Sequence, residues 1–205
     1  MPKKTNSFVF IGILTVLSSL LLSLAATQLK SYQDYNIDVD KKKNVLKCIG
    51  IDVSLLAPEN ILSEYNARIS EIITNSEGNN VESVEFSDLK MEENKMTGES
   101  IFTYQGKDYL PIFKSSLPET TIIPISGKGL WSTLFGYFAL DSDFNTVKGI
   151  TFYDHKETPG LGGEVDKGWF QNNFIGKKIK DDKGNLVSVQ VVKGKSGNNI
   201  HGVDG

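Results

Sequence analysis

An uncharged apolar segment near the N-terminus limits the fold of this chain more than any other feature. The segment FVFIGILTVLSSLLLSLAATQL, Phe8 to Leu29, contains no Asp, Glu, Lys or Arg over 22 residues. As an α-helix it would be about 33 Å long at ~1.5 Å per residue, which matches the hydrocarbon core of a bilayer, about 30 Å. We therefore expect residues 1–30 to form a single-pass membrane anchor in contact with lipid.

A cleaved signal peptide is the alternative interpretation of this segment. Such a peptide has an apolar core of about 7–15 residues and a cleavage site between small residues, and SLA at 23–25 resembles one. The apolar run is longer than that core, which favours a retained anchor. The flanking charges, Lys3 and Lys4 before the run and Lys30 and 41–43 after it, are ambiguous. Because a long domain can be translocated regardless of such charges, we expect a cytoplasmic N-terminus and a domain outside the cytoplasm.

Composition argues against several classes of function. The chain of 205 residues carries 22 Lys and Arg against 25 Asp and Glu, a net charge of -3. This mildly acidic balance, without a basic stripe interleaved with aromatic residues, argues against a nucleic-acid partner. A single cysteine, Cys48, permits no intrachain disulfide, and the two histidines, His155 and His201, show no metal-ligand spacing. We expect a buried Cys48 and neither a metal site nor zinc or nucleophilic hydrolysis.

Helical patterns dominate the part of the chain after the anchor. Residues 31–49 read as a polar helix that continues from the anchor, with Gly50 as its stop. A second helix is predicted to start at Pro58, a residue suited to a first helical turn, and to end at NSEGNN, 75–80. Its apolar stripe at a spacing near 3.6 is made of Ile61, Leu62, Tyr65, Ile69, Ile72 and Ile73.

Strand patterns dominate the rest of the chain, from residue 81 onward. Short strands are expected near SIFTYQ and DYLPIF within the mixed region 81–120, and longer strands at about 132–140 and 147–154, joined by the turn residues DSDFN. WFQNNFIGKKI suggests a short helix, and NLVSVQVVKG a further strand with Leu186, Val189 and Val191 apolar. Helices followed by antiparallel strands predict an α+β domain.

Two glycine-rich stretches are candidates for a binding site. SGKGLW at 126–131 fails the Walker A pattern, because no Ser or Thr follows the lysine. In ETPGLGG at 157–163, Pro159 and Gly160 suggest a tight turn, and Gly162 and Gly163 lack a Cβ, so another group can approach their backbone. A flat ring could lie against Leu161 with its polar edge at the glycine amides. The alternative for both stretches is a simple connection between elements.

Five stretches together resemble one known family. SGKGLWS, VKGITFYDHKETPGLGGEV, IGKKI, VVKGK and HGVDG occur in the order and at the spacing of the NqrC family, the C subunits of the sodium-translocating NADH:quinone oxidoreductase. The resemblance is specific over residues 121–205. The anchor also fits, whereas residues 31–110 resemble the family only in layout. The chain then divides into an anchor (1–30), a helical and mixed part (31–120) and an FMN-binding region (121–205).

The resemblance implies covalently bound FMN. Members of the family attach it by a phosphoester bond to a Thr in a Ser-Gly-Ala-Thr-type motif that follows HGVDG. Here the sequence ends at Gly205, and Ser126 and Ser196 lie in other contexts, so the attachment residue is unknown. We expect a C-terminally truncated sequence, which sequencing the coding DNA beyond the Gly205 codon would test.

The resemblance also implies which residues surround the flavin. Leu161 would pack on the isoalloxazine, Trp131 and Lys193 would line the pocket, and Asp204 would lie beside the attachment motif. No residue is expected to act as a catalytic acid or base. The implied cofactor-binding set is Trp131, Glu157, Thr158, Leu161, Gly162, Gly163, Lys193 and Asp204.

The function that follows from the resemblance is an electron relay. The FMN would accept an electron from one redox centre of a respiratory complex and pass it to the next flavin, while the complex oxidises NADH, reduces ubiquinone and exports sodium. The implied partners are the other membrane and flavin subunits, and the implied location is the bacterial inner membrane with a periplasmic domain. The alternatives are the G subunit of an Rnf-type ferredoxin:NAD oxidoreductase, which shares the ETPGLG loop, and a membrane-anchored scaffold without redox activity.

Overall fold

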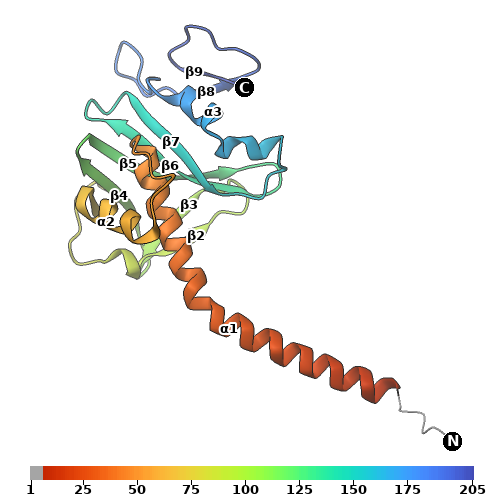
Figure 1. The fold of residues 1–205 in the computed structure, drawn as a ribbon. Helices are drawn as coiled ribbons and strands as arrows, with labels where there is room; N and C mark the ends of the chain where they lie inside the picture. The colour runs from red at the N-terminus through yellow and green to blue at the C-terminus, as the bar shows by residue number, and fades with distance from the viewer. Residues whose placement is uncertain (1–6) are drawn as a thin grey trace, which may run out of the picture. The chain divides into compact units, whose positions relative to one another are not determined.

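The fold is known from a computed structural model that describes residues 7–205 (Figure 1). The charges at Lys3 and Lys4 used in the orientation argument lie outside the described residues. The chain divides into two compact units, one ending at Val39 and one comprising Asp40–Gly205. Each unit is described by itself below.

The first unit is the N-terminal part of a single long helix, α1 (Ser7–Cys48). Its apolar side chains are exposed, Phe8 at 85% and Leu22 at 71% for example. The hydroxyls of Thr15 and Thr27 donate hydrogen bonds of 2.9 Å to the carbonyls four residues earlier, which satisfies them within the helix. By length and composition the helix is able to cross a membrane, with a mean hydropathy of 2.5 over its most apolar window.

The C-terminal turns of α1 belong to the second unit and form part of its core. Val45, Leu46 and Cys48 are fully buried, as expected for Cys48. The helix ends at Cys48, and Gly50 follows with a φ of +85°. The expected polar helix is therefore confirmed as a continuation of the anchor helix, with Gly50 as its stop.

The second helix, α2 (Pro58–Arg68), is shorter than predicted. It begins at Pro58 as expected, but residues 69–75 form strand β1 (Ile69–Asn75), which pairs antiparallel with β4 (Lys107–Ser116). Three isoleucines assigned to the helical stripe, Ile69, Ile72 and Ile73, therefore lie in a strand. β-branched side chains favour that conformation, and a short apolar run does not distinguish the two periods.

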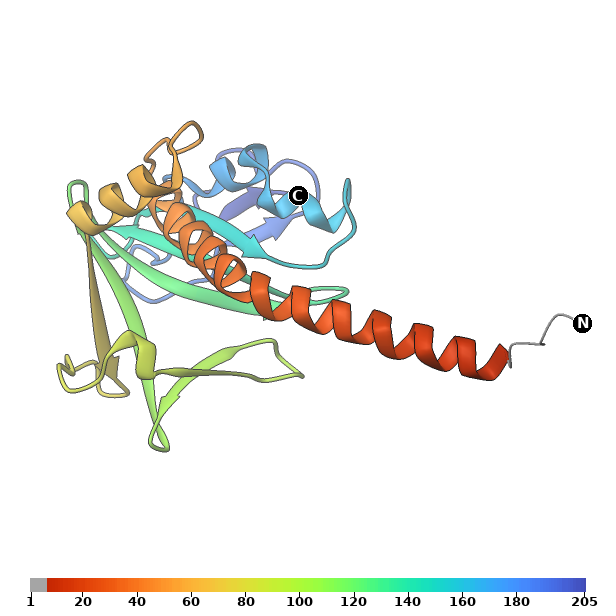
Figure 2. The same ribbon diagram turned by 60° about the horizontal axis from the view of Figure 1, so that its bottom comes forward.

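An antiparallel sheet of seven strands forms the body of this unit. Its order is β2-β3-β4-β5-β6-β7, with β1 also pairing with β4. The remaining strands are β2 (Lys90–Glu93), β3 (Ser100–Tyr104), β5 (Glu119–Lys128), β6 (Thr133–Asp141) and β7 (Val147–Asp154). The strands expected at SIFTYQ, DYLPIF, 132–140 and 147–154 are confirmed as β3, β4, β6 and β7. Figure 2 shows that the sheet is strongly curved.

The segment after β7 contains short elements only. It forms η2 (Gly162–Asp166), α3 (Gly168–Gln171) and η3 (Asn172–Phe174), so the predicted short helix is confirmed. The predicted strand at NLVSVQVVKG is wrong in extent: β8 covers Gln190–Val192 and pairs in parallel with β9 (Gly202–Asp204). Leu186 is 77% exposed and takes part only in an isolated bridge with Lys180. The α+β class is confirmed.

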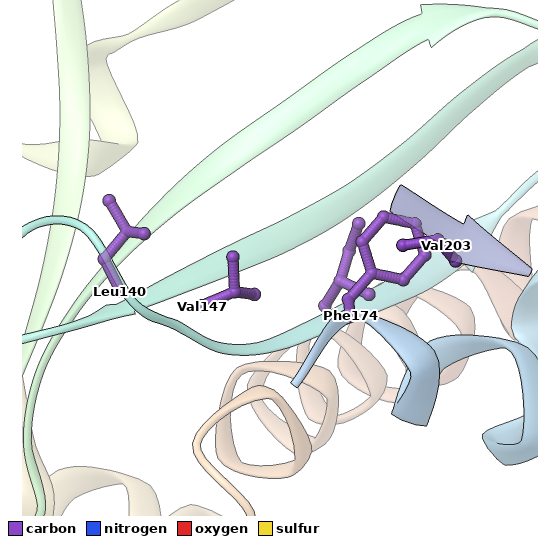
Figure 3. Packing of buried hydrophobic residues seen from close by; sticks show 5 residues of the cluster. Leu140, Val147, Phe174 and Val203 are labelled. Carbon is purple, nitrogen blue, oxygen red and sulfur yellow. The ribbon is translucent and has the colours of Figure 1, made fainter. Parts of the chain in front are cut away.

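A small apolar cluster attaches the C-terminal segment to the sheet. Leu140 and Val147 of the sheet share this cluster with Ile150, Phe174 and Val203, and all five are buried (Figure 3). Figure 3 shows the ring of Phe174 directly beside Val203. Burying such a side chain stabilises the fold by roughly 1.5–3 kcal/mol, so η3 and β9 have fixed places on the sheet.

Candidate functional site

The two glycine-rich stretches meet at one end of the sheet. Residues 129–132 connect β5 to β6, and residues 155–161 follow β7. In the β6–β7 pair Phe135 lies opposite Asp154, so the start of β6 is beside the end of β7. Antiparallel pairing thus brings two loops together that are separated by more than 20 residues in the sequence.

A buried carboxylate joins the two loops. Glu157 Oε1 accepts hydrogen bonds from the backbone amides of Trp131 (2.9 Å) and Ser132 (3.1 Å). The Glu157 side chain is only 8% exposed. Ser132 Oγ in turn accepts a hydrogen bond of 2.7 Å from the amide of Lys156. The bonds run in both directions between the loops, so each loop fixes the backbone of the other.

At the glycines of this region, other atoms of the protein occupy the space that a Cβ would fill. A Cβ at Gly129 would collide with Glu157 Oε1 and with the Leu134 side chain, and one at Gly162 would lie 3.0 Å from Glu157 Oε2. A Cβ at Gly163 would lie 3.1 Å from the Thr158 carbonyl oxygen. The close approach expected at these glycines therefore exists, and its partner is the loop itself.

The expected turn at Pro159 and Gly160 is confirmed. Leu161 N donates a hydrogen bond of 3.1 Å to the carbonyl of Thr158, and Gly160 has a φ of +75°. Gly163 N donates to the same carbonyl at 3.0 Å. The turn leaves the Leu161 side chain 73% exposed.

Large apolar side chains are exposed on both loops. Trp131 is 69% and Leu130 is 81% exposed, and Leu161 lies on the loop joined to theirs. Trp169, just after η2, is 57% exposed, and its Nε1 donates to Glu164 Oε2 at 3.0 Å. Exposed apolar side chains on loops that are joined to each other make this end of the sheet a candidate binding surface. The residues of this region that the sequence prediction missed are Leu130, Trp169, Gly129 and Ser132, although the motif SGKGLWS contains three of them.

Lys193 and Asp204, the remaining members of the predicted set, lie on another segment. Lys193 is exposed and directly follows β8. Asp204 in β9 accepts hydrogen bonds from Ser196 N (2.7 Å) and Ser196 Oγ (2.8 Å). Within residues 7–205, no hydrogen bond or ion pair joins Lys193 or Asp204 to the two loops. The structure thus brings six of the eight predicted residues together on the two loops and the first residues of η2.

The electrostatics of the site favour an ionised Glu157. The amide of Trp131, followed by that of Ser132, lowers the pKa of the Glu157 carboxyl below its ordinary value, and the nearby His155 acts in the same direction. His155 Nε2 lies 3.9 Å from Asp166 Oδ2, and Lys167 Nζ lies 3.0 Å from Asp166 Oδ1. The carboxylate is engaged by protein donors, which makes it structural and not a general base.

Cys48 takes no part in such a site. Its thiol donates to the carbonyl of Tyr137 at 3.3 Å, and burial raises its pKa to about 12. No group of three or more His, Cys, Asp or Glu side chains able to hold a metal ion is present among residues 7–205. The site therefore offers an apolar surface and backbone groups, which suit the binding of a flat ligand.

The sequence of this region matches a known domain family. Residues 129–205 match the model of the FMN-binding domain. The match begins at Gly129, the first residue of the first loop, and includes both loops and the segment with Lys193 and Asp204.

Similarity to known proteins extends over nearly the whole chain. The C subunit of the Na(+)-translocating NADH-quinone reductase of Haemophilus ducreyi is 33% identical over 215 residues, covering 98% of this chain and 82% of that protein. Its counterpart in Vibrio anguillarum is 32% identical with the same coverage. Among solved structures, the counterpart from Parabacteroides distasonis superposes with a TM-score of 0.67 at 33% identity, covering 86% of this chain and 83% of that one. Shewanella oneidensis NqrC superposes with a TM-score of 0.61 at 27% identity, covering 80% of each chain.

Proposed function

Since the chain belongs to the NqrC family, the C subunits of the Na(+)-translocating NADH-quinone reductase, we propose that it binds FMN at its two joined loops and relays electrons through it. The chain is a subunit of an oxidoreductase complex and carries an FMN-binding domain. The observation that supports the position is that the domain match begins at the first of the two loops joined by Glu157 and includes both of them. The Rnf-type and scaffold alternatives have no comparable support.

The residues at the loops fit a flavin. An isoalloxazine ring has broad apolar faces and a polar edge, and the loops present exposed apolar side chains at Trp131 and Leu161 beside exposed backbone at Gly162. When bound, FMN supplies reversible electron transfer, while the protein supplies position and electrostatics. The Glu157 carboxylate is already satisfied by backbone amides, so it does not compete as an acid or base.

Each predicted residue has a distinct part in this proposal. Trp131 and Leu161 cover the ring and exclude water from it. Thr158, Gly162 and Gly163 shape the loop at the polar edge of the ring, and Glu157 fixes the loops. Lys193, which is exposed, offers a positive charge to the FMN phosphate, and Asp204 orders the segment that leads to the attachment motif through its bonds to Ser196.

The covalent linkage belongs to the same proposal. The phosphoester to a Thr that follows HGVDG would start from a well-ordered point, because Val203 is fully buried and β9 pairs with β8. In a polypeptide that includes this Thr, flavin that remains bound in a denaturing gel, visible as a fluorescent band, would support the linkage. Flavin lost on denaturation would limit the proposal to non-covalent binding.

The partners and the location are proposed from the family and the anchor. A protein of this family acts beside other subunits, and we propose that its electron donor and acceptor are redox centres of those membrane and flavin subunits. The long apolar helix supports anchoring. We propose the bacterial inner membrane, with the N-terminus in the cytoplasm and the residues from Asp40 onward in the periplasm.

A flavin spectrum of the purified full chain in detergent tests the central proposal. We expect a yellow protein whose flavin absorption is bleached by dithionite and restored by air. Replacing both Trp131 and Leu161 with Ala should lower the flavin content at unchanged circular dichroism. A folded, colourless protein that also fails to bind added FMN would overturn the proposal.

A further inference from the structure

The structure assigns to Glu157 the role of a positioning residue: its buried carboxylate couples the loop that carries Trp131 to the loop that carries Leu161, so that both side chains form one surface for the flavin ring before the flavin binds. In this role Glu157 does not touch the cofactor. The inference rests on the proposed function, because it concerns the same FMN site.

The two carboxylate oxygens face different loops. Oε1 accepts the amide of Trp131 itself (2.9 Å) together with that of Ser132 (3.1 Å), so it fixes the backbone that carries the indole. Oε2 faces Gly162, the neighbour of Leu161, where an added Cβ would lie 3.0 Å away. One side chain therefore holds the backbone at Trp131 by hydrogen bonds and lies against the backbone next to Leu161.

The carboxylate requires the glycines on either side. Gly129 and Gly162 border Glu157 Oε1 and Oε2 respectively, and neither has room for a Cβ without displacing the carboxylate. Neither glycine has a φ in the left-handed region, so conformational freedom does not explain them. Both glycines border Glu157, and at Gly129 the Leu134 side chain and the Ser132 carbonyl also exclude a Cβ.

A charged group suits this position better than a neutral one. Two N–H groups converge on one oxygen, and hydrogen bonds to an ionised acceptor are roughly twice as strong as neutral ones. The titratable groups beside it are His155, which directly follows β7, and Lys156, and Asp166 of η2 lies near His155 and is paired with Lys167. His155 and the amides favour the ionised form.

Loss of the carboxylate should free Trp131 without unfolding the domain. The strand ends next to the loop have other anchors: Lys128 N donates to the Thr97 carbonyl at 3.0 Å, and Thr133 Oγ1 bonds to Glu93. The bond between Ser132 and Lys156 also remains. The expected effect is a local gain of freedom at residues 129–132, and binding a ligand to a less ordered site costs affinity.

The test uses Trp131 as its own reporter. The chain has two tryptophans, so Trp169→Phe leaves Trp131 alone. In this background, the flavin-free full chain in detergent should show lower Trp131 fluorescence anisotropy after Glu157→Gln, and FMN should bind about tenfold or more weakly, the effect of losing a hydrogen bond to a charged group. Glu92→Gln, the same change at an exposed position of β2, should alter neither quantity.

A second variant acts without removing the carboxylate. Gly162→Ala places a Cβ against Glu157 Oε2 and should change anisotropy and FMN affinity in the same direction as Glu157→Gln. Gly127→Ala is its control, because a Cβ there meets no atom within 4 Å. If Glu157→Gln failed to fold, this pair would still decide the question.

The pH dependence of the Trp131 fluorescence anisotropy distinguishes a positioning role of Glu157 from general structural support. A lowered pKa means that the coupling is complete at neutral pH and is lost only as the pH falls through the depressed value, below the ordinary pKa of Glu at about 4.3. Trp131 anisotropy should therefore fall in this acidic range in the parent, and lack this step in Glu157→Gln. Glu157→Asp, which retains the charge, should recover part of the affinity.

The outcomes are distinguishable. Unchanged anisotropy and unchanged FMN affinity in both Glu157→Gln and Gly162→Ala would overturn the positioning role and leave the proposed function intact. Failure of the parent chain to bind FMN would overturn the proposed function, while the anisotropy, measured without FMN, would still report on the coupling.

Discussion

At the scale of single residues, glycines and one cysteine determine how closely the elements of the domain approach each other. Gly149 of β7 borders the backbone carbonyl of Cys48, and Gly136 of β6 borders the carbonyl of Thr151. The last turn of α1 thereby rests directly on β7. Cys48 occupies the contact as a small buried group, with its thiol bonded to the Tyr137 carbonyl.

Gly149→Ala should destabilise the domain, because the new methyl group would meet the Cys48 carbonyl and force the helix away from the strand. Overpacking of this kind typically costs about 1–3 kcal/mol. Denaturant unfolding in detergent, followed by circular dichroism, measures the change. Gly127→Ala should alter the unfolding free energy little, and an equal effect of both variants would contradict this interpretation.

Much of the site could be predicted from residue identities, but not the way in which it is assembled. Leu161 and the glycines after it were proposed because a flat ligand needs bare backbone beside an apolar side chain, and Glu157 was added to the set by the resemblance to the NqrC family. The hydrogen bond from the Trp131 amide to Glu157 was not predicted, since residues about 25 apart in the sequence become neighbours only through the pairing of β6 with β7. Gly129 was missed for the same reason.

At the scale of elements, the differences between the predicted and the observed helices and strands have physical causes. The boundary between α2 and β1 was missed because Ile69, Ile72 and Ile73 fit both a helical stripe and a strand, and pairing with β4 decided between them. The strand predicted near 186–194 is limited to β8, because β9 supplies pairing partners only for Gln190–Val192. Long strands such as β6 and β7 were predictable, since their apolar patterns are sustained and turn residues separate them.

The attachment of the C-terminal segment should depend on Phe174. Phe174→Ala would leave a cavity beside Val203 and Ile150, and truncation of a buried Phe typically costs about 3–5 kcal/mol. Because β9 lies next to this cavity, we expect faster proteolysis in residues 177–200 than in the parent. Leu186→Ala, at an exposed position, should leave both proteolysis and stability nearly unchanged. A digestion pattern equally altered by both would contradict a specific role of the cluster.

At the scale of the whole molecule, the chain combines a helix whose apolar side chains are exposed with a domain that buries its own core. The exposed apolar residues of α1 up to Leu29 form a segment able to cross a membrane by length and composition, whereas the turns from Asp40 onward share the core of the domain. A retained anchor predicts that the mature protein keeps residues 1–30. Mass spectrometry of the protein extracted from membranes checks this, and a mass that lacks the N-terminal segment would instead indicate a cleaved signal peptide.

Thiol labelling can determine the side of the membrane on which the domain lies, because the only cysteine, Cys48, does not react with thiol reagents. Burial raises the pKa of Cys48 to about 12, so its thiol is both inaccessible and protonated near neutral pH. A cysteine introduced at Met96, which is 89% exposed in a turn, would then be the single reactive thiol. In Met96→Cys we expect labelling by a membrane-impermeant maleimide applied from the periplasmic side of intact cells, and none in the parent chain. Labelling of Met96→Cys only after the inner membrane is opened would place the domain in the cytoplasm, and the electron relay would then have to operate on that side.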